Sequence, residues 1–170
     1  PTTNQEALND TAAALETRVP VMLPMNVPVS KGNYLTATTT SQTWFYKTKF
    51  YQTSKPAKVN SIVAINGTPI VTVEGTEYKN SASAKEKIGP YIQVDPTQKL
   101  AIDLGHDIKA VANGAAGHAY ISWNEGRWSI NIDSPSDPHY RSKDYPDSKK
   151  LAEKPFWQSV HRSGELSTLK

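Results

Sequence analysis

The stretch from His118 to Asp133 decides the fold, and it reads HAYISWNEGRWSINID. Apolar and polar residues alternate on both sides of its centre, which is the period of a β-strand with one buried face. The tripeptide Asn124-Glu125-Gly126 lies between the two alternating runs, and its glycine can adopt the positive φ that a short hairpin turn requires. The pattern predicts two antiparallel strands, with Trp123 and Trp128 flanking the turn and anchoring the sheet to its core.

Length, composition and charge limit the class of protein. The chain has 170 residues, which favours one domain, and it contains no cysteine. Disulfides, thiolate catalysis and cysteine-based zinc sites are therefore excluded. No apolar run approaches the roughly 20 residues of a membrane span, and no apolar signal core opens the chain. The formal charge of +3 comes from 19 basic and 16 acidic residues that are interspersed, so no nucleic-acid partner is expected.

The remaining patterns predict an α+β fold around this hairpin. We expect further strands at 34–40, 43–52, 61–65, 70–78, 91–94, 99–104 and 108–112. We expect helices at 5–18, 80–89 and 147–161, a proline-rich extended connector at 19–28, a flexible link at 113–117 and a polar loop at 134–146. The predicted architecture is a curved antiparallel sheet, a meander of hairpins, with the N-terminal and C-terminal helices packed on it.

The strand predicted at 43–52 carries aromatic residues on both faces. Trp44, Tyr46 and Phe50 are the better core set. The other face then presents Phe45, Lys47, Lys49 and Tyr51. A face that mixes aromatic rings and lysines suits a sugar or a polyanion, and half-covered aromatic residues on a small sheet are the alternative interpretation. These four residues are the hypothetical ligand-binding site.

The candidates for catalysis are sparse. The stretch from Asp103 to Asp107, with His106 and possible help from His118, places an acid beside a base and offers two histidines for a metal. A bend between two strands explains the same residues, because no nucleophile elbow and no His-Glu-x-x-His motif is present. We therefore predict no catalytic residues, no metal and no cofactor.

Two sets of carboxylates are further candidates. Glu74, Glu77 and Glu125 lie in or beside predicted strands and offer a pair for glycosidic hydrolysis, although Glu125 also fits a turn. A second set clusters near the C-terminus and comprises Asp133, Asp137, Asp144 and Asp147. Its spacing differs from that of a calcium-binding loop, so a solvated loop is the preferred interpretation.

Several short motifs carry a resemblance to a known family. They are GNYLTATT at 32–39, FYQT at 50–53 with the following Lys55-Pro56, LGHDI at 104–108, and GAAG at 114–117 leading to WNEGRW at 123–128. The chain resembles extracellular lipoproteins of Gram-positive, lactobacillus-type bacteria. The resemblance implies a lipid-anchored chain with a Ser/Thr-rich tether and one α+β domain, and it assigns no activity to any residue. Because the sequence lacks a lipidated cysteine, we expect the anchor in a removed N-terminal segment, with residues 1–5 as the end of the tether.

Taken together, these observations predict a single α+β domain over residues 1–170 that acts outside the cell, at the cell surface. We expect a non-enzymatic binding module whose partner is a cell-wall polymer, a glycan or a protein. Membrane association is expected only through the removed lipid anchor. The alternative is a wall-active hydrolase or a metal-dependent enzyme that uses His106 and Asp107.

Overall fold

The computed structural model describes residues 2–15, 23, 27, 29–61, 69–87, 101–105, 108–115 and 118–135. Two helices lie in this part of the chain, α1 (Thr2–Ala14) and α2 (Ser81–Glu86). The strands are β1 (Tyr34–Gln42), β2 (Phe45–Thr53), β3 (Val71–Glu77), β4 (Ala101–Gly105), β5 (Ile108–Ala115), β6 (His118–Glu125) and β7 (Trp128–Pro135).

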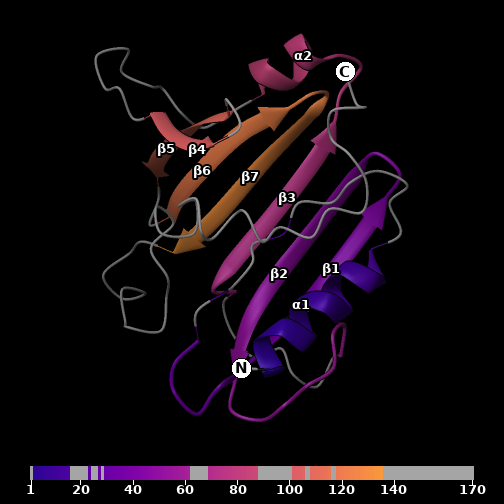
Figure 1. Cartoon of the computed structure of the whole chain (residues 1–170), viewed down its shortest axis with the longest axis vertical. Coiled ribbons are helices and arrows are strands. Elements are labelled where there is room, and N and C mark those ends of the chain that lie inside the picture. Colours follow the sequence, from indigo (N-terminus) through magenta and orange to yellow (C-terminus); the bar gives the residue numbers. More distant parts are fainter. Residues whose placement is uncertain are drawn as a thin grey trace.

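The strands form one sheet of seven, in the order β1-β2-β3-β7-β6-β5-β4, and every neighbouring pair is antiparallel. Two meanders build it, one from β1 to β3 and one from β4 to β7, and they meet where β3 pairs with β7 (Figure 1). Within the described residues β1 and β4 are the edges, so the sheet is open. Helix α1 packs on β1, and α2 contacts β6 and β7. The predicted antiparallel sheet and the packing of the N-terminal helix on it are confirmed.

The hairpin predicted at 118–133 is present as β6 and β7. Glu125 pairs with Trp128, so the loop consists of Gly126 and Arg127 and begins two residues later than expected. Gly126 has a φ of 52°, whereas Arg127 has no positive φ. A positive φ at the first loop residue alone is the sign pattern of a type II′ turn, whose twist matches that of the flanking strands. This turn type therefore favours a glycine at position 126.

The core lies against one face of the sheet, here called the core face. Trp123 and Trp128 are buried there, as predicted, together with Tyr46, Phe50, Val71, Val73, Ile130 and Ile132. The Tyr46 ring lies over its cross-strand neighbour Gly75, where a Cβ atom would overlap the ring. Helix α1 contributes Leu8 to the buried residues, and Leu15, directly after the helix, and Leu23 of the connector are buried as well.

Several predicted boundaries are corrected. Residues 2–5, expected at the end of a tether, form the first turn of α1, and that helix ends at Ala14 instead of residue 18. Residues 113–115, expected in a flexible link, extend β5 because they pair with β6. Residues 134–135, expected in the polar loop, extend β7. Residues 62–65, 91–94, 136–146 and 147–161 lie outside the described part of the chain, and so does the predicted C-terminal helix.

Candidate functional site

Alternation along β2 separates the two faces of the sheet. Tyr46, Thr48 and Phe50 are buried on the core face, whereas Phe45, Lys47 and Lys49 point to the opposite face and are half-buried. We call this opposite side the polar face, because its side chains are mostly hydroxyls, amides and charges. Besides the residues of β2, it carries Thr38, Thr40, Thr72, Glu74, Thr76, Asn124, Ser129, Asn131 and Asp133.

Three of the four predicted ligand-binding residues are brought together on the polar face. Phe45, Lys47 and Lys49 follow one another at every second position of β2. The prediction for the fourth residue is corrected: the Tyr51 side chain is only 8% exposed, so it is not accessible to a ligand. Its neighbour across the ladder, Thr36, donates its one hydroxyl hydrogen between the carbonyls of Ala57 (3.0 Å) and Lys58 (3.3 Å). The chain after β2 therefore folds onto this end of the polar face.

The charges of the polar face are partly matched. The Lys47 Nζ atom lies 3.7 Å from Glu74 Oε2, and the two side chains are 39% and 42% exposed. They are direct neighbours in the β2–β3 ladder, so their pairing follows from the register. Asp133 adds a second negative charge on the same face, two strands from Lys49. The face is therefore of mixed charge, which argues against a polyanion as its ligand.

Trp44 is a candidate site residue that sequence reasoning missed. It was expected in the core, but it lies in the two-residue turn between β1 and β2 and is 50% exposed. Its ring centroid is 5.7 Å from that of Phe45, with 46° between the ring planes. The Trp44 carbonyl accepts a hydrogen bond from the Glu77 N–H (2.8 Å), which fixes the turn against the end of β3. Its position next to the short polar run Ser41-Gln42-Thr43 was the available signal for a turn.

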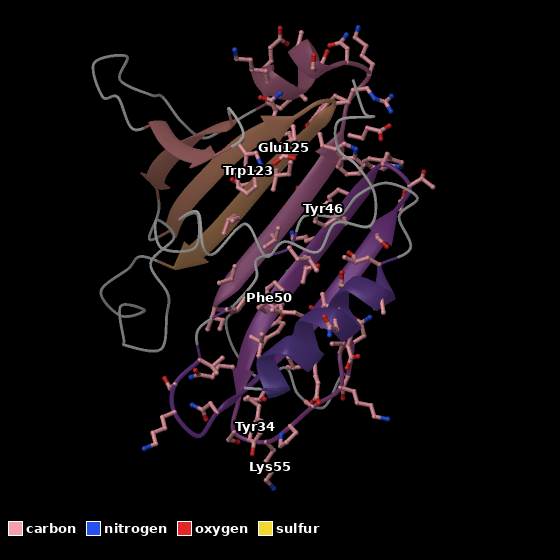
Figure 2. All side chains as sticks on the ribbon, in the orientation of Figure 1. Tyr34, Tyr46, Phe50, Lys55, Trp123 and Glu125 are labelled. Carbon is pink, nitrogen blue, oxygen red and sulfur yellow. The ribbon has the colours of Figure 1, made fainter. Side chains whose placement is uncertain are left out.

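The sheet thus has two different ends. The turn end comprises the β1–β2 turn, the end of β3 and the β6–β7 turn, and the loop end comprises residues 29–34 and 52–61. Figure 2 shows Trp123 and Glu125 toward the turn end and Tyr34 and Lys55 at the loop end. Trp44 and Phe45 belong to the turn end.

The three candidate carboxylates do not share a cleft. Glu74 lies on the polar face, whereas Glu77 and Glu125 lie on the core face, with Trp128 between them in the ladder. Glu125 is 7% exposed and accepts a hydrogen bond from the Trp123 indole (3.3 Å), and Glu77 pairs with Arg127 (3.7 Å). Glu125, considered as a turn residue, is therefore the buried last residue of β6.

The histidine candidates fall partly outside the described residues. His106 and Asp107 lie outside the described residues, but Asp107 directly precedes Ile108, the first residue of β5. His118 pairs with Ala115, the last residue of β5. An eight-residue strand separates these ends, a span of about 23 Å at 3.3 Å per residue. The two ends of β5 therefore lie far apart, and the described residues contain no group of side chains able to hold a metal ion.

Comparisons with protein-family models, curated proteins and solved structures find no match to this chain. Within the described residues, no helix is long and apolar enough to cross a membrane. The candidate surface is accordingly defined by its own geometry: the exposed Trp44 ring with the half-buried Phe45 at the turn end, and the hydrogen-bonding polar face beside them.

Proposed function

We propose that this chain is a non-enzymatic binding module at the outer surface of a Gram-positive cell, and that it binds a glycan chain at the turn end of its polar face. The lipid anchor in a removed segment, the curved sheet and the additional C-terminal helix expected from the sequence belong to this proposal. A glycan chain, including the sugar part of a wall polymer, is the preferred ligand class.

The observation that supports the proposal is Trp44, which is half exposed beside Phe45. Among the residues whose side chains the structure describes, it is the one large apolar side chain that is exposed, and tryptophan is enriched at binding interfaces because it combines an apolar ring with a polar N–H. A sugar ring offers an apolar C–H face for the indole and a rim of hydroxyls. Tryptophan supplies rigid contact area with few rotatable bonds, so little side-chain entropy is lost on binding.

The neighbouring side chains fit the hydroxyl rim of such a ligand. Lys47 and Glu74 form the next cross-strand pair on the same face, two residues along β2 from Phe45, and they offer both donors and acceptors. Thr76, which pairs with Phe45, adds a hydroxyl. These side chains offer few contacts to a single sugar unit, so useful affinity is expected from several units of one chain.

The test uses tryptophan fluorescence in the Trp157→Phe background. Trp123 and Trp128 are buried, so Trp44 is the exposed reporter among the described tryptophans. Chito-oligosaccharides and soluble wall fragments are titrated, and protection of Trp44 from acrylamide quenching is followed. Saturable protection without new reducing ends is expected. Absence of binding to both ligands would overturn the proposal.

The matched variants are Trp44→Ala and, at the loop end, Tyr34→Ala, with affinity measured by calorimetry. Loss of the stacking surface in Trp44→Ala should weaken binding roughly tenfold, or about 1.4 kcal/mol. Tyr34→Ala should retain the affinity of the unmodified chain. Equal affinity in all three proteins would contradict the assignment, and release of reducing ends that His106→Ala abolishes would favour the hydrolase alternative.

A further inference from the structure

A pocket of about 740 Å³ lies at the loop end of the sheet and is lined by residues 52–61. Its volume is within the range of about 300–1,000 Å³ that is usual for small-molecule sites. Figure 2 shows Lys55, one of its lining residues, at the end of the molecule opposite Trp123 and Glu125. The pocket is therefore separate from the surface proposed to bind a glycan.

The pocket is built on a segment that is fixed to the edge of the sheet. The Asn60 N–H donates to the Ala37 carbonyl (2.8 Å), and Asn60 Oδ1 accepts from the Thr39 N–H (2.7 Å). Asn60 adopts a left-handed φ of 63°, which asparagine tolerates better than most residues. The Thr36 hydroxyl of β1 also hydrogen-bonds to the carbonyls of Ala57 and Lys58. A ligand therefore meets walls that are already ordered, which lowers the entropic cost of binding.

The charge of the loop end is positive and is not balanced locally. Lys55 and Lys58 line the pocket and are exposed, and Lys31 lies in the adjoining turn. That turn is joined to β2 by the Ser30 N–H, which donates to Gln52 Oε1 (2.6 Å). Residues 29–34 and 52–61 include no Asp or Glu, and the ion pairs formed among the described residues use Lys47 and Arg127 instead.

We propose that this pocket binds the phosphate group of an organic phosphate ester, with Lys55 and Lys58 as its cationic contacts. Lysine is a common phosphate ligand because its ammonium acts as a point charge with three donors. The lining hydroxyls of Ser54 and Ser61 add neutral donors. The volume exceeds what a bare phosphate needs and leaves room for the organic group of an ester.

The test measures binding of two phosphate sources to the full chain. Glycerol 3-phosphate is titrated by calorimetry, and vesicles of phosphatidylglycerol in phosphatidylcholine are compared with pure phosphatidylcholine by sedimentation. Binding of the soluble ester supports a free ligand, whereas binding of the anionic vesicles alone supports a lipid headgroup. Failure of both probes to bind would overturn the proposal.

Two double variants with the same change in net charge identify the site. Lys55→Gln with Lys58→Gln removes the two pocket charges, and Lys85→Gln with Lys87→Gln removes two exposed charges at α2. The first should weaken phosphate binding roughly tenfold or more, because charge-assisted contacts are lost, and the second should leave it unchanged. Equal losses of phosphate binding in both double variants would show that the net charge of the protein attracts the ligand. That result would overturn the assignment of the site to the pocket. Trp44→Ala should retain phosphate binding, so failure of the glycan proposal and failure of this one are distinguishable.

Discussion

The two ends of the sheet use charge in different ways. At the turn end, two acidic side chains of β3 are each paired with a cation, Glu74 with Lys47 and Glu77 with Arg127, both at 3.7 Å. At the loop end, Lys31, Lys55 and Lys58 form no ion pair with any described residue. Charged side chains that are paired across neighbouring strands or turns contribute to the stability of the sheet. Charged side chains that are exposed around a pocket remain available to a ligand.

The two ends also differ in what holds them together. Aromatic packing dominates the turn end, where the Tyr46 and Trp128 ring centroids are 5.9 Å apart and Trp123 is buried beside Glu125. Hydrogen bonds hold the loop end, through Asn60 and Thr36. Substitutions at the turn end should therefore have the larger effects on stability, because burial of a large ring outweighs a single hydrogen bond.

The largest effect is expected from Trp128→Ala, which removes a ring that is 1% exposed. We expect the free energy of unfolding to fall by about 3–5 kcal/mol, from lost burial and from the cavity left behind. Urea unfolding followed by far-UV circular dichroism measures it. Trp128→Phe should be milder, because it keeps a ring and deletes an indole N–H that has no partner among the described groups. A loss below 1 kcal/mol in Trp128→Ala would contradict the role given to aromatic packing.

Gly75→Ala should have the next largest effect. Its Cβ would overlap the Tyr46 ring, so the ring or the strand must shift, at a cost of about 1–3 kcal/mol. The same substitution in a Tyr46→Leu background should cost less, because the shorter side chain does not cross position 75. The double-mutant cycle should therefore be non-additive, and additive losses would assign the effect to backbone propensity instead.

Sequence patterns predict the strands better than they predict the turns, the loops and the long-range packing around them. Alternation placed Phe45, Lys47 and Lys49 on one face and put Trp123 and Trp128 in the core, because a strand has a period of two whatever covers it. The sequence also predicts the short helix α2, because Asn80 is a favoured N-cap residue. In the structure its side chain accepts a hydrogen bond from the Ser83 N–H (2.8 Å).

The errors arise where segments distant in the sequence meet. Tyr51 is buried beside Thr36, and the bonds from Thr36 to the chain after β2 are long-range contacts that alternation cannot reveal. Trp44 keeps the phase of Tyr46, but a turn places it outside the ladder and exposes it. The small residues at 113–115 resemble a linker, although pairing with β6 makes them a strand. Sequence patterns do not predict the pocket at the loop end, because its walls depend on hydrogen bonds between residues 57–60 and β1, which are distant in the sequence.

Asn60→Ala should give an intermediate effect at the loop end. It removes the acceptor of the Thr39 N–H and places a Cβ-bearing residue without a polar side chain at positive φ, for an expected loss of about 1–2 kcal/mol. Asn60→Gly relieves the backbone strain but not the missing acceptor, so it should fall between Asn60→Ala and the unmodified chain. Urea unfolding ranks the three proteins. Asn60→Ala should also weaken glycerol 3-phosphate binding without any change in charge, and unaltered binding would show that the fixed segment is not needed.

The smallest effect is expected from the Lys47 and Glu74 ion pair, which is about two-fifths exposed on each side. A double-mutant cycle with Lys47→Gln and Glu74→Gln should give a coupling of about 0.2–1 kcal/mol, because water screens the pair and ordering two long side chains opposes it. Raising the salt concentration should reduce that coupling further. Lys55→Gln should change the free energy of unfolding by less than about 0.5 kcal/mol, as expected of an exposed residue without a partner. If Lys55→Gln destabilised the chain more than Lys47→Gln, the lysine at the loop end would be a structural residue, and the contrast between paired and ligand-binding charges would fail.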